Sequence, residues 1–213
     1  MQATAARQLA RALTVVGVVG TLGAGPAASA LPSAIDVLAR VNEHDARVES
    51  YAVPVHMEVR IHKLFTFHIG LSGTQYFKRP GRLALDIHQI PPQYRKLFAD
   101  LGTPLTWPAT YDMRLAATAN SRYQLDGVPR RPCDVEHLAV DVDGDPGAPL
   151  HAVWRMHDGS TIDMHITEQL ESGYDLPKHA DADMAFGGYR IHASIDYGAY
   201  TVNEAVADSV FGA

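Results

Sequence analysis

The sequence has a single cysteine, Cys133, among its 213 residues. One cysteine excludes an intramolecular disulfide framework and zinc modules that need several cysteines. Basic residues are also few, since 18 Lys and Arg stand against 24 Asp and Glu for a net charge of -6. Proteins that bind nucleic acids neutralise phosphates with basic stripes, so we expect no nucleic-acid partner. After the first thirty residues no apolar run reaches membrane-spanning length, which excludes a polytopic membrane protein.

Local motifs of the common enzyme classes are missing as well. There is no Gly-x-Ser-x-Gly elbow, no Walker loop and no Gly-x-Gly-x-x-Gly motif. Asp141, Asp143 and Asp145 alternate as in a calcium loop, but Pro146 interrupts the loop and Ala152 stands where the twelfth-position glutamate belongs. We therefore expect an acidic turn here, no cofactor, and a protein that is not an enzyme.

The first thirty residues have the three parts of a secretory signal peptide. Arg7 and Arg11 provide a positive start, residues 12–22 are apolar, and Ala28-Ser29-Ala30 is a small-x-small cleavage site. An anchoring helix is the alternative, but the segment is rich in glycine and short for a span. We expect cleavage after Ala30, export to the periplasm, and one mature domain at 31–213.

Hydrophobic periodicity predicts a helix followed by strands. Ser33 and Asp36 have the spacing of an N-cap, and apolar residues then recur at helical intervals, which predicts a helix over 33–50. From Tyr51 to Ile61 the period changes to two, as in a strand with one apolar and one wet face. Pro54, which has no amide hydrogen, favours an edge position for this strand.

The same alternation recurs along most of the remaining chain, with Gly, Pro and Asp turns between the apolar stretches. Shorter helices are expected at 92–101 and 203–211, and the segment 103–120 has no clear assignment. The predicted fold class is α+β: a strongly curved antiparallel sheet, an unclosed half-barrel, with helices covering the concave face. Such a sheet leaves an apolar cavity if the helices do not fill it; the alternative is that its own side chains fill the space.

The run from Gly73 to Leu83 (GTQYFKRPGRL) resembles the periplasmic lipoprotein carrier family, LolA and its relatives. The order of elements, from signal peptide to first helix, long strand, and Lys78-Arg79-Pro80, is similar to that family from about Ala34 to Ile87. The resemblance implies a half-barrel with a helical lid that binds acyl chains. It also implies that Arg79 ties the lid to the barrel and acts in release of the cargo; the residues alone leave open a solvated strand-end arginine.

We therefore expect an exported carrier that holds the acyl chains of a lipid or lipoprotein, with membrane donor and receptor proteins as further partners. The alternative is an envelope sensor or protein-docking module on the same scaffold that carries nothing. The candidate residues for lining the cavity are all apolar. They are Val55, Met57, Val59, Phe65, Phe67, Ile69, Phe77, Leu83, Leu85, Trp107, Trp154 and Met156.

Eleven histidines raise a third hypothesis, a hydrolase or metal-binding protein. His56, Glu58 and His62 share one face of a predicted strand, and His68 and His88 lie on the polar faces of predicted neighbours. These positions belong to the solvent side of the sheet, where alternation alone requires polar residues. We therefore expect a wet face and no metal site.

Overall fold

The computed structural model describes residues 32–87, 89, 97–98, 100–120, 122–143 and 150–211. The expected signal peptide at 1–30 lies outside the described residues, as do His88 and most of the acidic turn after Asp143. Helical elements are α1 (Ala34–Val41), η1 (His44–Arg47), α3 (Trp107–Thr110) and η2 (Asp208–Phe211), and residues 97–98 and 100–101 are also helical. The strands are β1 (Ser50–His62), β2 (Thr66–Lys78), β3 (Arg82–Asp86), β4 (Tyr111–Ala119), β5 (Arg122–Pro129), β6 (Val135–Asp143), β7 (Leu150–Met156), β8 (Thr161–Glu171), β9 (Tyr174–Phe186), β10 (Tyr189–Tyr197) and β11 (Thr201–Val202).

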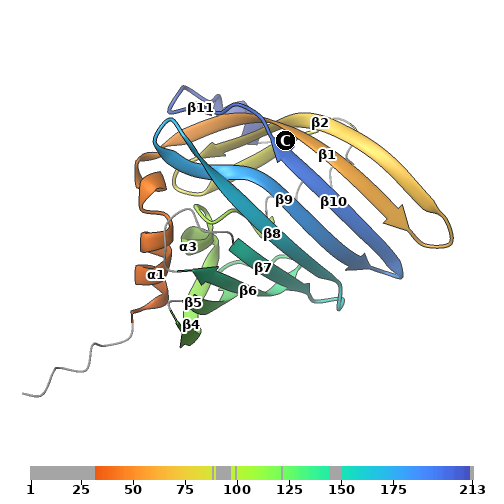
Figure 1. Ribbon diagram of the computed structural model, residues 1–213, viewed down its shortest axis with the longest axis horizontal. Coiled ribbons are helices and arrows are strands. Elements are labelled where there is room, and N and C mark those ends of the chain that lie inside the picture. Colours follow the sequence, from red (N-terminus) through yellow and green to blue (C-terminus); the bar gives the residue numbers. More distant parts are fainter. Residues whose placement is uncertain are drawn as a thin grey trace, which may run out of the picture. The chain divides into compact units, whose positions relative to one another are not determined.

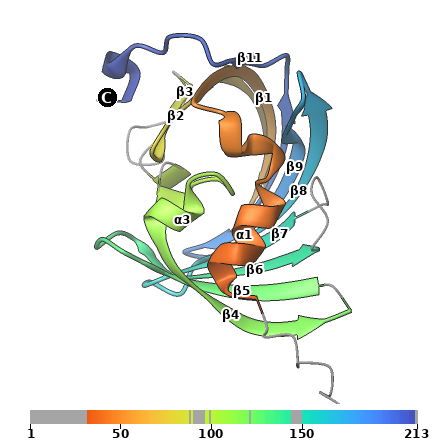
Figure 2. The ribbon, with the colours of Figure 1, turned by 90° about the vertical axis from the view of Figure 1, so that its left-hand side faces the viewer.

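These eleven strands form a single antiparallel sheet in the order β3-β2-β1-β10-β9-β8-β7-β6-β5-β4, with β11 paired to β1 (Figure 1). The strands β3 and β4 stand at opposite ends of this order, so the sheet does not close into a barrel. Figure 2 shows the sheet curving around α1. The prediction of a curved, unclosed antiparallel sheet is confirmed.

Helix α1 begins with a capping box. The Asp36 amide donates to Ser33 Oγ at 3.2 Å, and the Ser33 amide donates to Asp36 Oδ2 at 3.0 Å. Its apolar face, Ala34, Val37, Leu38 and Val41, is buried in the same core as the concave side of the sheet, and α1 contacts β4. The expected helix over 33–50 was too long, because α1 ends at Val41 and a turn and η1 separate it from β1.

The edge position predicted from Pro54 is wrong, because β1 lies between β2 and β10. The Pro54 carbonyl accepts from the Gly198 amide at 2.8 Å. A strand residue directs its amide and carbonyl to the same side, so the amide hydrogen that proline lacks would also point toward Gly198. This is the gap between β10, which ends at Tyr197, and β11, which begins at Thr201. Proline therefore sits where the neighbouring strand is interrupted.

The helix expected over 203–211 is also wrong, since only Asp208–Phe211 is helical, as η2. Asn203 adopts a left-handed conformation with φ of 61°. Its Oδ1 accepts from the Glu49 amide at 2.7 Å, and its Nδ2 donates to the Arg47 carbonyl at 3.1 Å. Asn203 thus fastens the C-terminal segment to the start of β1 instead of beginning a helix.

The unassigned segment 103–120 contributes α3 and β4 to the core. Trp107 of α3 is fully buried and meets Trp154 of β7 edge to face, with ring centroids 6.1 Å apart. The Trp107 Nε1–H donates to the Leu101 carbonyl at 3.2 Å, which anchors the helical residues before it. No helix within the described residues is long and apolar enough to cross a membrane.

Candidate functional site

The concave face of the sheet is apolar because alternate residues of each strand point toward it. In β1 the residues Tyr51, Val53, Val55 and Met57 are all buried, whereas His56 and Glu58 at intervening positions of the alternation, on the opposite face, are exposed. A pocket of about 60 Å³ lies between this face and Phe98 together with Leu101–Pro104. A volume of that size holds a few water molecules, so most of the interior is filled by side chains.

Several strands contribute to the pocket wall. Leu83 and Leu85 of β3 and Met164 and Ile166 of β8 line it, as does Phe98, which comes from outside the sheet. The wall carries no charged side chain among the described residues.

The few polar groups at the wall are neutral. Gln75 Nε2 donates to the Tyr51 hydroxyl at 2.8 Å, so this buried amide is satisfied within the wall. Burial raises the pKa of Tyr197 from 10 to about 12, so its phenol, neutral at physiological pH in any case, stays neutral to still higher pH. A site without charge favours an apolar ligand or an apolar part of one.

The twelve predicted lining residues fall into three groups. Val55, Met57, Leu83 and Leu85 line the pocket. The second group is buried core away from the pocket wall: Phe77, Trp107, Trp154 and Met156. The third group comprises half-buried Val59 and three exposed residues, namely Phe65 in the turn before β2 and Phe67 and Ile69 of β2. Their role in lipid binding stays a prediction.

The exposed residues continue the concave apolar face beyond the pocket. Ile69 pairs with Val59 and Phe67 pairs with Ile61, so each shares the face of its β1 partner. Strand β3 pairs only with Thr74–Lys78, which leaves the first half of β2 as an edge. Phe67 is consequently 59% exposed and Ile69 43% exposed.

We call Phe65, Phe67 and Ile69 the β2 apolar edge. Figure 1 shows this end of β2 far from α1 and α3.

Arg79, at the end of β2, contacts the segment that joins α1 to β1. Its Nε donates to the Val48 carbonyl at 2.7 Å, and its Nη2 donates to the Ala46 carbonyl at 3.1 Å. The Arg79 amide also donates to the Glu49 carbonyl at 2.9 Å. The guanidinium therefore holds the connection after α1 against the end of β2, and its part in cargo release stays a prediction.

The convex face is polar. Of the histidines singled out from sequence, His56 contacts Ser72 Oγ at 3.0 Å and His62 contacts Thr66 Oγ1 at 3.1 Å, while His68 is exposed. Sequence reasoning missed the histidines of β7 to β10, which lie among aspartates. The signal available was the alternation of His and Asp along these strands.

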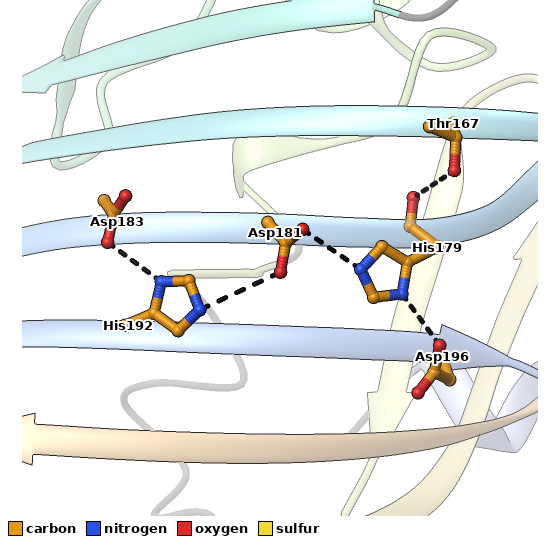
Figure 3. A network of polar contacts seen from close by, with 6 residues as sticks. All are labelled: Thr167, His179, Asp181, Asp183, His192 and Asp196. Atoms are coloured by element: carbon orange, nitrogen blue, oxygen red, sulfur yellow. Dashed lines mark hydrogen bonds and ion pairs between the residues drawn. The ribbon is translucent and has the colours of Figure 1, made fainter.

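In β9 and β10 these residues form a connected network (Figure 3). His179 Nδ1 contacts Asp196 Oδ1 at 2.7 Å and its Nε2 contacts Asp181 Oδ2 at 3.1 Å. His192 Nδ1 contacts Asp183 Oδ1 at 3.0 Å and its Nε2 lies 3.8 Å from Asp181 Oδ1. The hydrogen bond to Asp196 raises the pKa of His179, and desolvation opposes it in part.

No protein-family model and no curated protein matches the sequence. Solved structures are similar at the level of the fold. A LolA superfamily protein from Nitrosomonas europaea superposes with a TM-score of 0.58 at 13% identity, covering 85% of this chain and 98% of the other. A DUF1329 family protein from Desulfovibrio piger gives a TM-score of 0.54 at 13% identity, over 83% of this chain and 94% of the other. The fold of this chain is therefore similar to that of a LolA superfamily protein, as the resemblance around Arg79 implied.

Proposed function

We propose that this protein is an exported carrier that binds the acyl chains of a lipid or lipoprotein against the concave face of its sheet. The observation that carries the proposal is the uncharged, apolar concave face, which continues from the pocket at Val55 and Met57 to the exposed β2 apolar edge. Burial of apolar ligand surface there supplies about 25 cal/mol per Å². No cofactor is needed for such binding.

Loading requires the pocket to enlarge, because about 60 Å³ cannot take a long acyl chain. The movable part is the cover: α1 and residues 97–98 and 100–110 act as a lid over the concave face. Arg79 fastens this lid to the sheet, because its guanidinium donates hydrogen bonds to the carbonyls of Ala46 and Val48, which follow α1. In the carrier, residues 1–30 direct export to the periplasm, 31–213 form the lipid-binding domain, and membrane donor and receptor proteins load and unload it.

Native mass spectrometry with lipid extraction on the mature protein, purified from its own envelope, tests the proposal. We expect a phospholipid or an acylated peptide at close to one per chain. Phe67→Glu places a charge on the apolar face at an exposed position, so it should fold and lose most of the bound lipid. Val128→Glu is the matched control: Val128 is 53% exposed, against 59% for Phe67, but it lies on β5.

A mass without ligand that stays unchanged after incubation with lipid vesicles would refute the carrier. Equal lipid binding by Phe67→Glu and Val128→Glu would show that the β2 apolar edge takes no part. For Arg79, we expect Arg79→Leu to load lipid but to transfer it to acceptor vesicles at a changed rate, with Arg82→Leu, which removes an ion pair to Asp208, as the control.

The second candidate is the protein-docking module. The mostly filled interior and the exposed β2 apolar edge favour it, because an exposed apolar patch is typical of a protein-binding surface. A protein that stays free of lipid, together with a partner from the same envelope whose binding Phe67→Glu abolishes and Val128→Glu leaves intact, would select docking over carriage.

A further inference from the structure

Two histidines and an aspartate meet on the convex face where β7 and β8 pair. His151 stands directly opposite His165 in the register, and Asp163 precedes His165 by two residues on the same strand face. One ligand atom from each of the three lies within 4.8 Å of the other two. This set is independent of the apolar concave face and of the function proposed for it.

The distances match those between ligands of a tetrahedral zinc ion. Zinc binds imidazole nitrogen and carboxylate oxygen at about 2.0–2.2 Å, which separates tetrahedral ligands by about 3.4 Å. Asp163 Oδ1 lies 2.9 Å from His151 Nε2 and 3.6 Å from His165 Nε2. A single carboxylate oxygen therefore faces both imidazoles at separations on either side of the ideal value.

A fourth residue is placed to orient His151. Its Nδ1 lies 3.3 Å from Asp141 Oδ2 on β6, and its Nε2 lies 2.9 Å from Asp163 Oδ1. In the tautomer that donates Nδ1–H to Asp141, the Nε2 lone pair is free for an ion beside Asp163. Histidines that bind metals almost always donate their other ring N–H in this way, which fixes the tautomer and raises the basicity of the ligand nitrogen. Asp141 thus supplies the supporting carboxylate that a metal-binding imidazole requires.

We propose that His151, Asp163 and His165 bind a divalent transition-metal ion of the zinc type, with Asp141 as the positioning residue of His151. The His151 and His165 rings are stacked, with an interplanar angle of 7° and centroids 4.3 Å apart. Parallel rings cannot both direct a lone pair at one ion, so binding turns His165 about its broad χ2 torsion. The His165 side chain is 68% exposed and has room to turn.

The donor set selects the class of metal. Two imidazoles and one carboxylate suit zinc, copper and nickel, whereas calcium and magnesium prefer six or more oxygens. Three protein ligands leave the fourth tetrahedral position to water. The partial exposure of His151 (31%) and Asp163 (47%) gives the ion direct access from solvent.

The neighbouring network at β9 and β10 provides a natural control. Asp181 also lies between two imidazoles, but it meets His179 and His192 with different oxygens, at 3.1 and 3.8 Å (Figure 3). His192 is 30% exposed, which matches His151 at 31%. One carboxylate oxygen therefore faces both imidazoles at Asp163, whereas two different oxygens do so at Asp181.

Isothermal titration of tag-free mature protein with Zn²⁺ alone tests this site, with Co²⁺ absorption to report tetrahedral coordination. We expect one ion per chain. Asp141→Asn should weaken binding about 10- to 100-fold, as the loss of a supporting carboxylate does elsewhere. His151→Ala and His165→Ala should weaken it further, and His192→Ala should leave it unchanged. Circular dichroism confirms that each variant is folded, which is expected because all these side chains are on the surface.

No saturable Zn²⁺ binding by folded wild-type protein would overturn the proposal. So would equal losses in His151→Ala and His192→Ala, which would place the ion elsewhere on the histidine-rich face. Undiminished binding by Asp141→Asn would keep the three ligands but remove the positioning role of Asp141.

Discussion

The two faces of the sheet arise from the same alternation of residues along the strands, but one face is apolar and the other is polar. On the concave face most of the alternate residues are apolar, and neighbouring strands add to one continuous core that includes α1. On the convex face the intervening positions hold histidines and aspartates that interact across strands, as His151 does with Asp141 and Asp163. The concave face gains its stability from area buried, whereas the convex face contributes specific polar contacts that are individually weak in water.

The largest expected effect is therefore on the concave side. Phe77 is fully buried and stacks on Tyr51 with ring centroids 5.2 Å apart. Phe77→Ala should lower the free energy of unfolding by about 3–5 kcal/mol, because it removes apolar contacts and leaves a cavity. His68→Ala, on the convex face of the same strand, should change it by about 0.5 kcal/mol or less. Urea denaturation of both variants measures the difference; similar values would mean that the two faces do not differ as described.

Two glycines of β2 sharpen the comparison at smaller scale. Gly73 pairs with Val55 on the concave side, where an added Cβ would meet the Asp86 carbonyl and Ile87 Cγ1, the latter at 2.5 Å. Gly70, by contrast, would meet only a side-chain atom of His56 at 4.0 Å.

Gly73→Ala should consequently cost about 1–3 kcal/mol through overpacking, and Gly70→Ala should be neutral or stabilise by about 0.4–1 kcal/mol through reduced freedom of the unfolded chain. Thermal and urea unfolding of the pair provide the measurement. Equal stability of the two variants would show that Asp86 and Ile87 leave room for a Cβ atom at Gly73.

The concave face was predictable from sequence because it depends on a local period. The alternation from Tyr51 to Ile61 predicted β1, and repetition of the pattern predicted a large antiparallel sheet. Errors arose where distant residues decide the outcome. Pro54 occupies a central strand because the partner strand is interrupted near Gly198, and Asn203 bonds Arg47 and Glu49 across the chain instead of starting a helix.

The two candidate sites also differ in how far the sequence alone predicts them. Val55, Met57, Leu83 and Leu85 line the pocket and share an alternation that sequence reveals. The set of His151, Asp163 and His165 depends on the register between β7 and β8, which no local period specifies. The sequence alone singled out His56 and His62, which are close in the chain, and the expectation was that they bind no metal; their rings contact the hydroxyl groups of Ser72 and Thr66.

The smallest expected effect is the protonation of a convex histidine. The Asp196 carboxylate, 2.7 Å from His179 Nδ1, raises the pKa of His179 above the ordinary value of 6.5, with a further contribution from Asp181. A raised pKa in the folded state means that protonated His179 stabilises the fold below pH 6.5, and that this contribution disappears as the pH rises through the folded-state pKa. The side chain is 32% exposed, so the effect on stability should be small.

Titration of the His179 ring by NMR should give a pKa above 6.5 in the wild type. Asp196→Asn should lower this pKa, because an amide cannot offer the imidazolium a negative charge. Asp141→Asn removes a carboxylate from β6, away from the His179 ring, and should leave the His179 pKa where it was. A His179 pKa that did not respond to Asp196→Asn would mean that this histidine titrates as an isolated surface group. The two faces of the sheet would then differ in their packing but not in electrostatic coupling between side chains.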